Sequence, residues 1–138
     1  MNLLLVTARF YEEIADELVK GASTYLRERG IRYQEITVPG AFEIPAAIRF
    51  AMDTGNYDGF IALGCVIRGE TTHYDYVCGE SARGLMDLAV QHRAAIGYGI
   101  LTVETMEQAK VRADIRQGNK GADAAAACLR MIELKNPQ

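Results

Sequence analysis

Residues 69–76, with the sequence GETTHYDY, bring together groups that can bind an anion and move a proton, directly after the apolar run of residues 60–67. Glycine allows close backbone approach, and the free N–H groups of a helix start favour an anion such as phosphate. His73, one of two histidines in the chain, carries an imidazole, a group suited to proton transfer in carbonyl chemistry. The segment equally fits helix capping by Thr71 or Thr72 and a structural histidine.

Residues near other expected strand ends could complete a small-molecule site. Phe10 and Phe42 could stack on a planar ring, although core packing is the more frequent fate of phenylalanine. Glu43 could accept hydrogen bonds from ligand hydroxyls or simply occupy the first turn of a helix. Arg112 and Lys120 could neutralise phosphate or remain solvated. No GxxxxGK[ST] or GxGxxG pattern is present, so neither a nucleoside triphosphate nor a dinucleotide is indicated.

Alternating apolar and amphipathic segments predict the framework that carries these residues. Strands are expected over residues 3–7, 31–38, 60–67 and 95–102. Helices are expected through residues 14–26 with a stop at Gly30, over 43–53, through 85–89, from a cap at Thr105 through Val111, and over 122–134. This order predicts one α/β domain over residues 1–138, a three-layer α/β/α sandwich of flavodoxin-like type with a four-stranded parallel sheet. Such sheets bind ligands beyond the carboxyl ends of their strands, which gathers residues 8–11, 39–43, 68–73 and 102–105 into one crevice.

Composition excludes some functional classes. The 138 residues carry a formal net charge of −3, which argues against a general nucleic-acid binder. The three cysteines, Cys65, Cys78 and Cys128, form no CxxC pair, which predicts free thiols in a reducing cytosol and no zinc site. The apolar N-terminal run is too short for a signal peptide and no segment reaches the length of a membrane span, so a cytoplasmic protein is expected.

Six segments, taken in order, resemble the lumazine synthase family: ARF, VPGAFEIP, LGCVIRGETTHYDYV, GILTVETMEQA, RA and GNKGADAA. The similarity extends over nearly the whole chain, and PGAFEIP and VIRGETTHYDYV are highly specific. The resemblance implies a transferase in the penultimate step of riboflavin biosynthesis. Its reaction condenses 5-amino-6-(D-ribitylamino)uracil with 3,4-dihydroxy-2-butanone 4-phosphate to 6,7-dimethyl-8-ribityllumazine, phosphate and water. No metal or organic cofactor is implied.

The resemblance also implies site residues, in three groups. The ribitylaminouracil is bound by Phe10 against its ring, by Ala41, Phe42 and Glu43 along the ribityl chain and ring edge, and by the backbone of Cys65, Val66 and Ile67. The phosphorylated ketone is bound at its phosphate by Glu70, Thr71 and Arg112. His73 transfers protons during its reaction. The edge of the site is formed by Tyr98, Lys120 and Asp123.

In this family the site lies between neighbouring subunits of a five-fold ring. We therefore expect residues 10, 41–43 and 65–73 from one subunit and residues 98, 112, 120 and 123 from the next, in a homo-oligomer that is a pentamer or a multiple of pentamers. Riboflavin synthase is a candidate partner. A lone monomer would lack a complete site.

Three departures from the family pattern concern local contacts and assembly. Tyr11 stands where asparagine is common, which affects one polar contact. Residues 114–117 replace the glycine, threonine and lysine common in capsid-forming members, and the sequence starts close to its first strand, where many relatives carry an extra segment. Pentamer, decamer and sixty-subunit shell all stay open.

Two alternatives to the synthase are an archaeal-type riboflavin synthase and a non-catalytic flavin or lumazine carrier on the same scaffold. The RGETTHYDYV and GNKG segments favour lumazine synthase over the former. A carrier needs neither a proton shuttle nor a phosphate clamp, so His73 and Arg112 favour the enzyme.

Overall fold

Four parallel strands form the centre of the fold. The structure, a computed structural model, describes residues 1–137. Strands β1 (Asn2–Ala8), β2 (Arg32–Val38), β3 (Gly59–Ile67) and β4 (Ile96–Val103) form one sheet in the order β2-β1-β3-β4. The helices are α1 (Glu12–Glu28), α2 (Ile44–Met52) after a 3-10 turn η1 (Ala41–Glu43), α3 (His73–Gln91), α4 (Met106–Ala113) and α5 (Lys120–Lys135). The predicted flavodoxin-like α/β fold with a four-stranded parallel sheet is confirmed.

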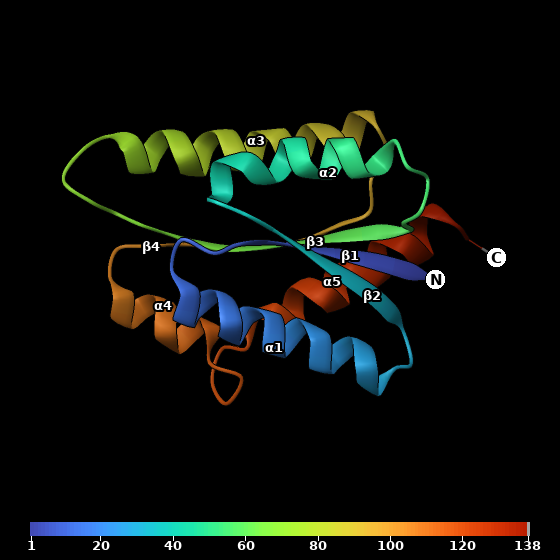
Figure 1. The fold of residues 1–138 in the computed structure, drawn as a ribbon, viewed down its shortest axis with the longest axis horizontal. Helices are drawn as coiled ribbons and strands as arrows, with labels where there is room; N and C mark the ends of the chain where they lie inside the picture. Colours follow the sequence, from blue (N-terminus) through green and yellow to red (C-terminus); the bar gives the residue numbers. More distant parts are fainter. Residues whose placement is uncertain (138) are drawn as a thin grey trace.

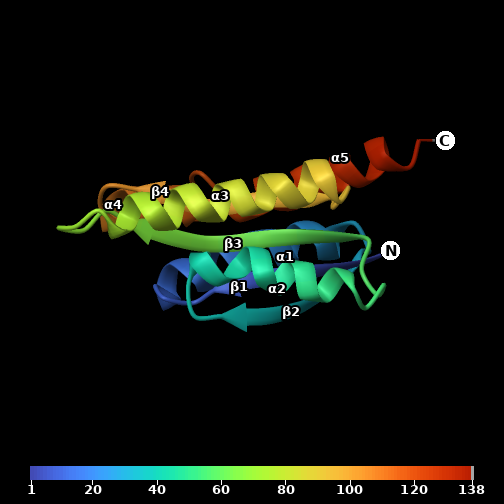
Figure 2. The ribbon, with the colours of Figure 1, turned by 90° about the horizontal axis from the view of Figure 1, so that it is seen from above.

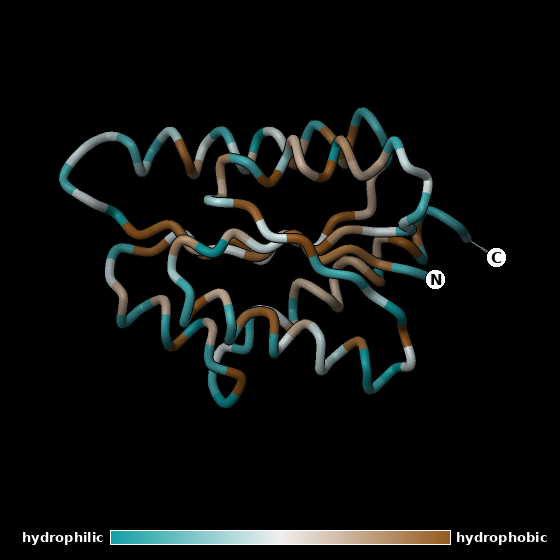
Figure 3. Tube along the Cα trace, viewed as in Figure 1, coloured by the Kyte–Doolittle hydropathy of each residue, from teal (hydrophilic) through white to brown (hydrophobic). Residues whose placement is uncertain are grey.

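Helices cover both faces of the sheet (Figure 1). Side chains alternate along each strand, so Leu3 and Leu5 join a buried cluster with α1, α4 and α5, while Leu4 and Val6 join a second cluster with α2 and α3. Figure 3 shows the apolar residues concentrated along the sheet and on the inner sides of the helices. Burial on both faces explains why β1 and β3 are almost continuously apolar in sequence, whereas the edge strand β2 is mostly exposed and carries polar residues.

The order in which strands are added to the sheet reverses at β1. The chain passes from β1 to β2 on one side and then returns to β3 and β4 on the other, with all strands running the same way (Figure 2). Thr7 accordingly pairs with Thr37 of β2 and with Leu63 of β3. The connections after β1 and β3 leave toward opposite faces, which opens a crevice at the carboxyl ends of these two strands.

The last helix begins two residues earlier than the sequence indicates. Asn119 takes a left-handed conformation with φ of 46°, which asparagine tolerates better than most residues, and Lys120 and Gly121 are already helical. A Cβ atom at Gly121 would overlap the carbonyl oxygen of Leu18, so this glycine lets α5 lie directly against α1. In residues 1–137, none of the helices has the length and apolar character needed to cross a bilayer.

Candidate active site

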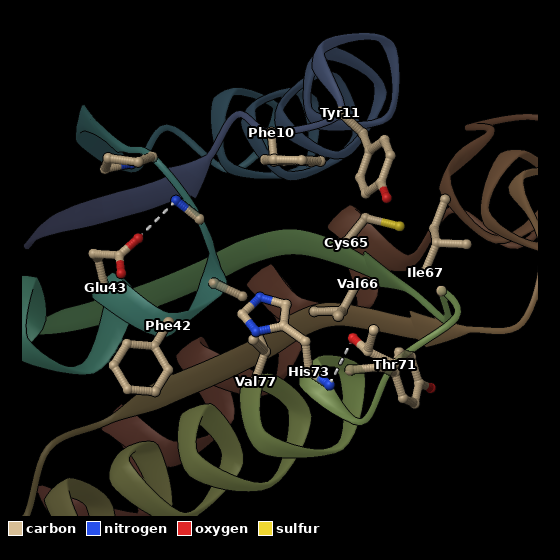
Figure 4. Close-up of a pocket in the computed structure, with 15 residues that line it drawn as sticks. Phe10, Tyr11, Phe42, Glu43, Cys65, Val66, Ile67, Thr71, His73 and Val77 are labelled. Carbon is tan, nitrogen blue, oxygen red and sulfur yellow. Dashed lines mark hydrogen bonds between the residues drawn. The ribbon is translucent and has the colours of Figure 1, made fainter.

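A cleft of about 500 Å³ opens at the carboxyl ends of β1 and β3 (Figure 4). Its walls are supplied by the three connections that follow β1, β2 and β3, together with the end of β3 and the start of α3. Its lining residues are Phe10, Tyr11, Pro39, Gly40, Ala41, Phe42, Glu43, Cys65, Val66, Ile67, Gly69, Thr71, His73, Tyr74 and Val77. This is the crevice where ligands bind in open parallel sheets.

Two aromatic rings are exposed at the cleft. Phe10 is 72% exposed and Phe42 is 56% exposed, although both are large apolar side chains. Core packing, the commoner fate of phenylalanine, therefore does not explain either residue. Exposed aromatic faces at a concave site are suited to a planar ligand ring.

The floor of the cleft is the end of β3. The Cys65 side chain is buried in the core, while Val66 and Ile67 are half-buried. Burial raises the pKa of the Cys65 thiol to about 11, so at neutral pH the sulfur is protonated and is not a nucleophile. The strand therefore offers shape and backbone groups to a ligand.

Glu43 fixes the turn that presents Phe42. Its Oε1 accepts a hydrogen bond from the backbone N–H of Gly40 at 3.0 Å. This contact closes η1 just before α2, whose second residue is Pro45, a residue suited to the first turn of a helix. The carboxylate thus has a structural role and also lines the cleft.

The loop of residues 68–72 leads from β3 into α3 and ends at His73. The Thr71 hydroxyl accepts a hydrogen bond from the His73 backbone N–H at 3.3 Å, whereas Thr72, the N-cap, makes no capping bond with its side chain. The His73 imidazole is directed into the cleft between Phe42 and Val66 (Figure 4). Glu70 belongs to the same exposed loop but does not line the cleft.

The remaining expected site residues lie elsewhere on the chain. Tyr98 is on β4, Arg112 is in the last turn of α4, and Lys120 and Asp123 are in the first turn of α5. Arg112 donates to the Gln108 carbonyl oxygen at 3.1 Å, and Lys120 pairs with Asp123 at 3.4 Å. All four are exposed, and none lines the cleft. The cleft formed by residues 1–137 consequently has no lysine or arginine in its lining.

Sequence reasoning did not assign a site role to several lining residues, including Tyr11, Tyr74 and Val77. Val77 is four residues after His73 in α3, so helical periodicity could have placed it on the same face. Tyr11 packs against the core and directs its hydroxyl into the cleft beside Cys65 (Figure 4). No group of three or more histidine, cysteine or acidic side chains within residues 1–137 is arranged to hold a metal ion.

Comparison with known proteins gives a consistent result over nearly the full length. Residues 1–136 match the family model described as 6,7-dimethyl-8-ribityllumazine synthase. A protein of that name from Methylobacterium radiotolerans is 56% identical over 134 residues, covering 97% of this chain and 82% of its own. One from Bartonella bacilliformis is 57% identical, with 97% and 90% covered. A 6,7-dimethyl-8-ribityllumazine synthase 1 from Rhizobium meliloti is 55% identical, with 98% and 92% covered.

Proposed function

The chain belongs to the 6,7-dimethyl-8-ribityllumazine synthase family, and we propose that its reaction takes place in the cleft at β1 and β3 once a second subunit completes the site. The reaction is the transfer step of riboflavin biosynthesis that joins ribitylaminouracil to the phosphorylated dihydroxybutanone and releases phosphate and water. Identity above 50% to the lumazine synthases compared above, over nearly the whole chain, is the observation that supports this activity. A carrier without turnover is not favoured.

The ribitylaminouracil lies between the exposed rings and the end of β3. Phe10 stacks on the pyrimidine, Phe42 and Ala41 contact the ring edge and ribityl chain, and the backbone of residues 65–67 binds the ring's polar atoms. Glu43 accepts hydrogen bonds from ribityl hydroxyls. The exposure of Phe10 and Phe42 supports this arrangement, because both rings lack a place in the core.

The phosphorylated ketone lies at the start of α3. Backbone N–H groups of residues 69–72, those of Glu70 and Thr71 among them, surround its phosphate, where the helix dipole favours negative charge. His73 transfers protons during imine formation, phosphate elimination, ring closure and dehydration. The attacking nucleophile is the amine of the uracil itself, which agrees with a cleft lining that contains no lysine.

Two effects account for most of the catalysis. Holding two reactants in register can lower the barrier by up to roughly 7–11 kcal/mol, and proton transfer by His73 adds about 10²–10⁴-fold. Arg112 stabilises the charge that develops on the leaving phosphate.

A neighbouring subunit supplies Arg112 together with Tyr98, Lys120 and Asp123. The cleft formed by residues 1–137 has no lysine or arginine in its lining, yet a phosphate dianion is stabilised by a permanent positive charge, and the four residues are exposed away from the cleft. The assembly is a homo-oligomer, a pentamer or a multiple of it, with riboflavin synthase as a candidate partner. Residues 1–138 act as one synthase domain, and the free thiols suit the reducing cytoplasm.

The test is an assay with both substrates that follows lumazine fluorescence and phosphate release together. We expect coupled formation of the two products, strongly reduced in Arg112→Ala and little changed in the matched control Lys110→Ala, which removes a cation from the same helix. Binding of a flavin or lumazine without product formation would instead identify a carrier. Full activity in Arg112→Ala would exclude the phosphate role of this arginine.

A further inference from the structure

A cluster of charged and aromatic side chains surrounds the first residue of the loop that joins β3 to α3. The Nε atom of Arg68 donates to Oε2 of Glu104 at 2.7 Å. One of the two terminal nitrogens of the guanidinium lies 3.5 Å from Oδ1 of Asp75. The guanidinium carbon stands 4.3 Å from the ring centroid of Tyr74. These contacts of Arg68 are separate from the substrate contacts proposed above.

The cluster holds this loop at both ends. Arg68 is its first residue and precedes residues 69–72, while Tyr74 and Asp75 follow in the first turn of α3. The backbone N–H of Arg68 donates to the Val103 carbonyl oxygen at 3.0 Å. Glu104, the next residue, is fixed in turn by a bond from its N–H to the Gln108 side chain at 2.8 Å. One guanidinium thus links the loop, the sheet edge and two helix starts.

Arg68 is not itself placed to bind the substrate phosphate. It does not line the cleft, and two carboxylates already neutralise its charge. Exposed ion pairs of this kind contribute little to stability. The planar fork of arginine, however, fixes orientation when several partners bind it at once. These contacts are therefore better suited to holding a loop geometry than to holding the fold together.

We propose that Arg68 is a positioning residue for the phosphorylated ketone. Through Glu104, Asp75 and Tyr74 it keeps residues 69–72 in the conformation that turns their N–H groups toward the phosphate and His73 toward the cleft. Tyr74 lines the cleft, so the arginine also braces one of its walls. This inference rests on the proposed phosphate site at the start of α3.

The experiment compares Arg68→Ala with Arg83→Ala in the assembled enzyme. Arg83 lies on α3, the helix that follows the loop of Arg68, and also pairs with two carboxylates, Glu80 at 2.8 Å and Asp87 at 3.2 Å, but it is outside the cleft. We expect Arg68→Ala to raise KM for the phosphorylated ketone about tenfold while KM for ribitylaminouracil changes less than about twofold, because only the loop is misplaced. Arg83→Ala should leave both constants unchanged.

Two further variants keep the test decisive. Glu104→Gln weakens the strongest contact of Arg68 without removing a side chain, and we expect the same selective rise in KM, smaller in size. Arg68→Lys should recover the activity only in part, because an ammonium group keeps an ion pair but loses the fork and the stacking on Tyr74. Identical kinetics for Arg68→Ala and Arg83→Ala would overturn the proposal, as would equal rises in KM for both substrates.

Inorganic phosphate separates this inference from the proposed site on which it rests. As a competitive inhibitor against the phosphorylated ketone, it should bind wild type and Arg83→Ala equally and Arg68→Ala about tenfold more weakly, if loop geometry sets phosphate affinity. No competition in the wild type would refute the phosphate site itself. Competition of equal strength in wild type and Arg68→Ala would refute only the role of Arg68.

Discussion

The rings of Phe10 and Tyr11 pack edge to face, with their centroids 4.9 Å apart and their planes at 73°. The two side chains have opposite environments, since Tyr11 packs against the core while Phe10 is 72% exposed. A ring anchored in the core therefore fixes an exposed ring at the mouth of the cleft. This arrangement presents an aromatic face to a ligand without using that face for stability.

Replacement of Phe10 should consequently separate binding from stability. We expect Phe10→Ala to weaken binding of ribitylaminouracil by roughly 1–3 kcal/mol, the usual contribution of stacking on one base, with an unchanged melting temperature. Phe10→Tyr keeps the planar face and should bind almost as the wild type does. Calorimetric titration and thermal unfolding measure the two quantities. Unaltered affinity in Phe10→Ala, or a large loss of stability, would contradict the stacking role.

A site shared between subunits predicts that two inactive variants restore each other. His73→Ala and Arg112→Ala should each have little activity alone. After dissociation and reassembly of an equal mixture, roughly one quarter of the sites combine an intact His73 with an intact Arg112 from the neighbour. Lumazine formation before and after mixing measures this recovery. If both residues acted in one chain, mixing would restore nothing.

Gly121 is predicted to be indispensable for the packing of α5 on α1. Gly121→Ala places a methyl group on the Leu18 carbonyl oxygen, and such overpacking typically costs about 1–3 kcal/mol. The matched control is Gly79→Ala in α3, where a Cβ would meet nothing within 4 Å and helix propensity should stabilise by up to about 1 kcal/mol. Urea unfolding measures the free energy of unfolding of both variants. Equal values for Gly121→Ala and Gly79→Ala would contradict the close packing of α5 on α1 as the reason for this glycine.

The order of the elements was predictable because each depends on local sequence. Strands buried on both faces are continuous apolar runs, and the alternation with helices fixes a parallel sheet. The loops at strand ends then follow from chain direction, which is why Phe10, Phe42 and His73 could be expected at one crevice.

Contacts between distant side chains were not predictable in this way. Glu104 is 36 residues from Arg68, and both charges fit an ordinary solvated surface when the sequence is read alone. The contact of Tyr11 with the core likewise depends on residues that are distant in the sequence. The early start of α5 depends on the left-handed conformation of Asn119, which no local pattern requires.

The buried thiols predict how stability changes at alkaline pH. Burial raises the pKa of Cys65 from 9.0 to about 11 and that of Cys128 to about 12. Above about pH 9 the unfolded chain therefore loses thiol protons that the folded chain keeps, and the free energy of unfolding falls by up to about 1.4 kcal/mol per pH unit for each thiol. Below that pH the contribution is fully present and stability does not depend on these groups.

Cys128 allows the effect to be isolated, because its side chain is fully buried in the core and is not part of the cleft lining. Cys128→Ala should cost about 1 kcal/mol at neutral pH through lost packing, yet its stability should decline less steeply than that of the wild type as pH rises from about 9 to 11. Tyrosine and lysine ionisation affects both proteins equally, so the difference between the two slopes reports the thiol alone. Parallel slopes would mean that the folded state does not hold the Cys128 proton.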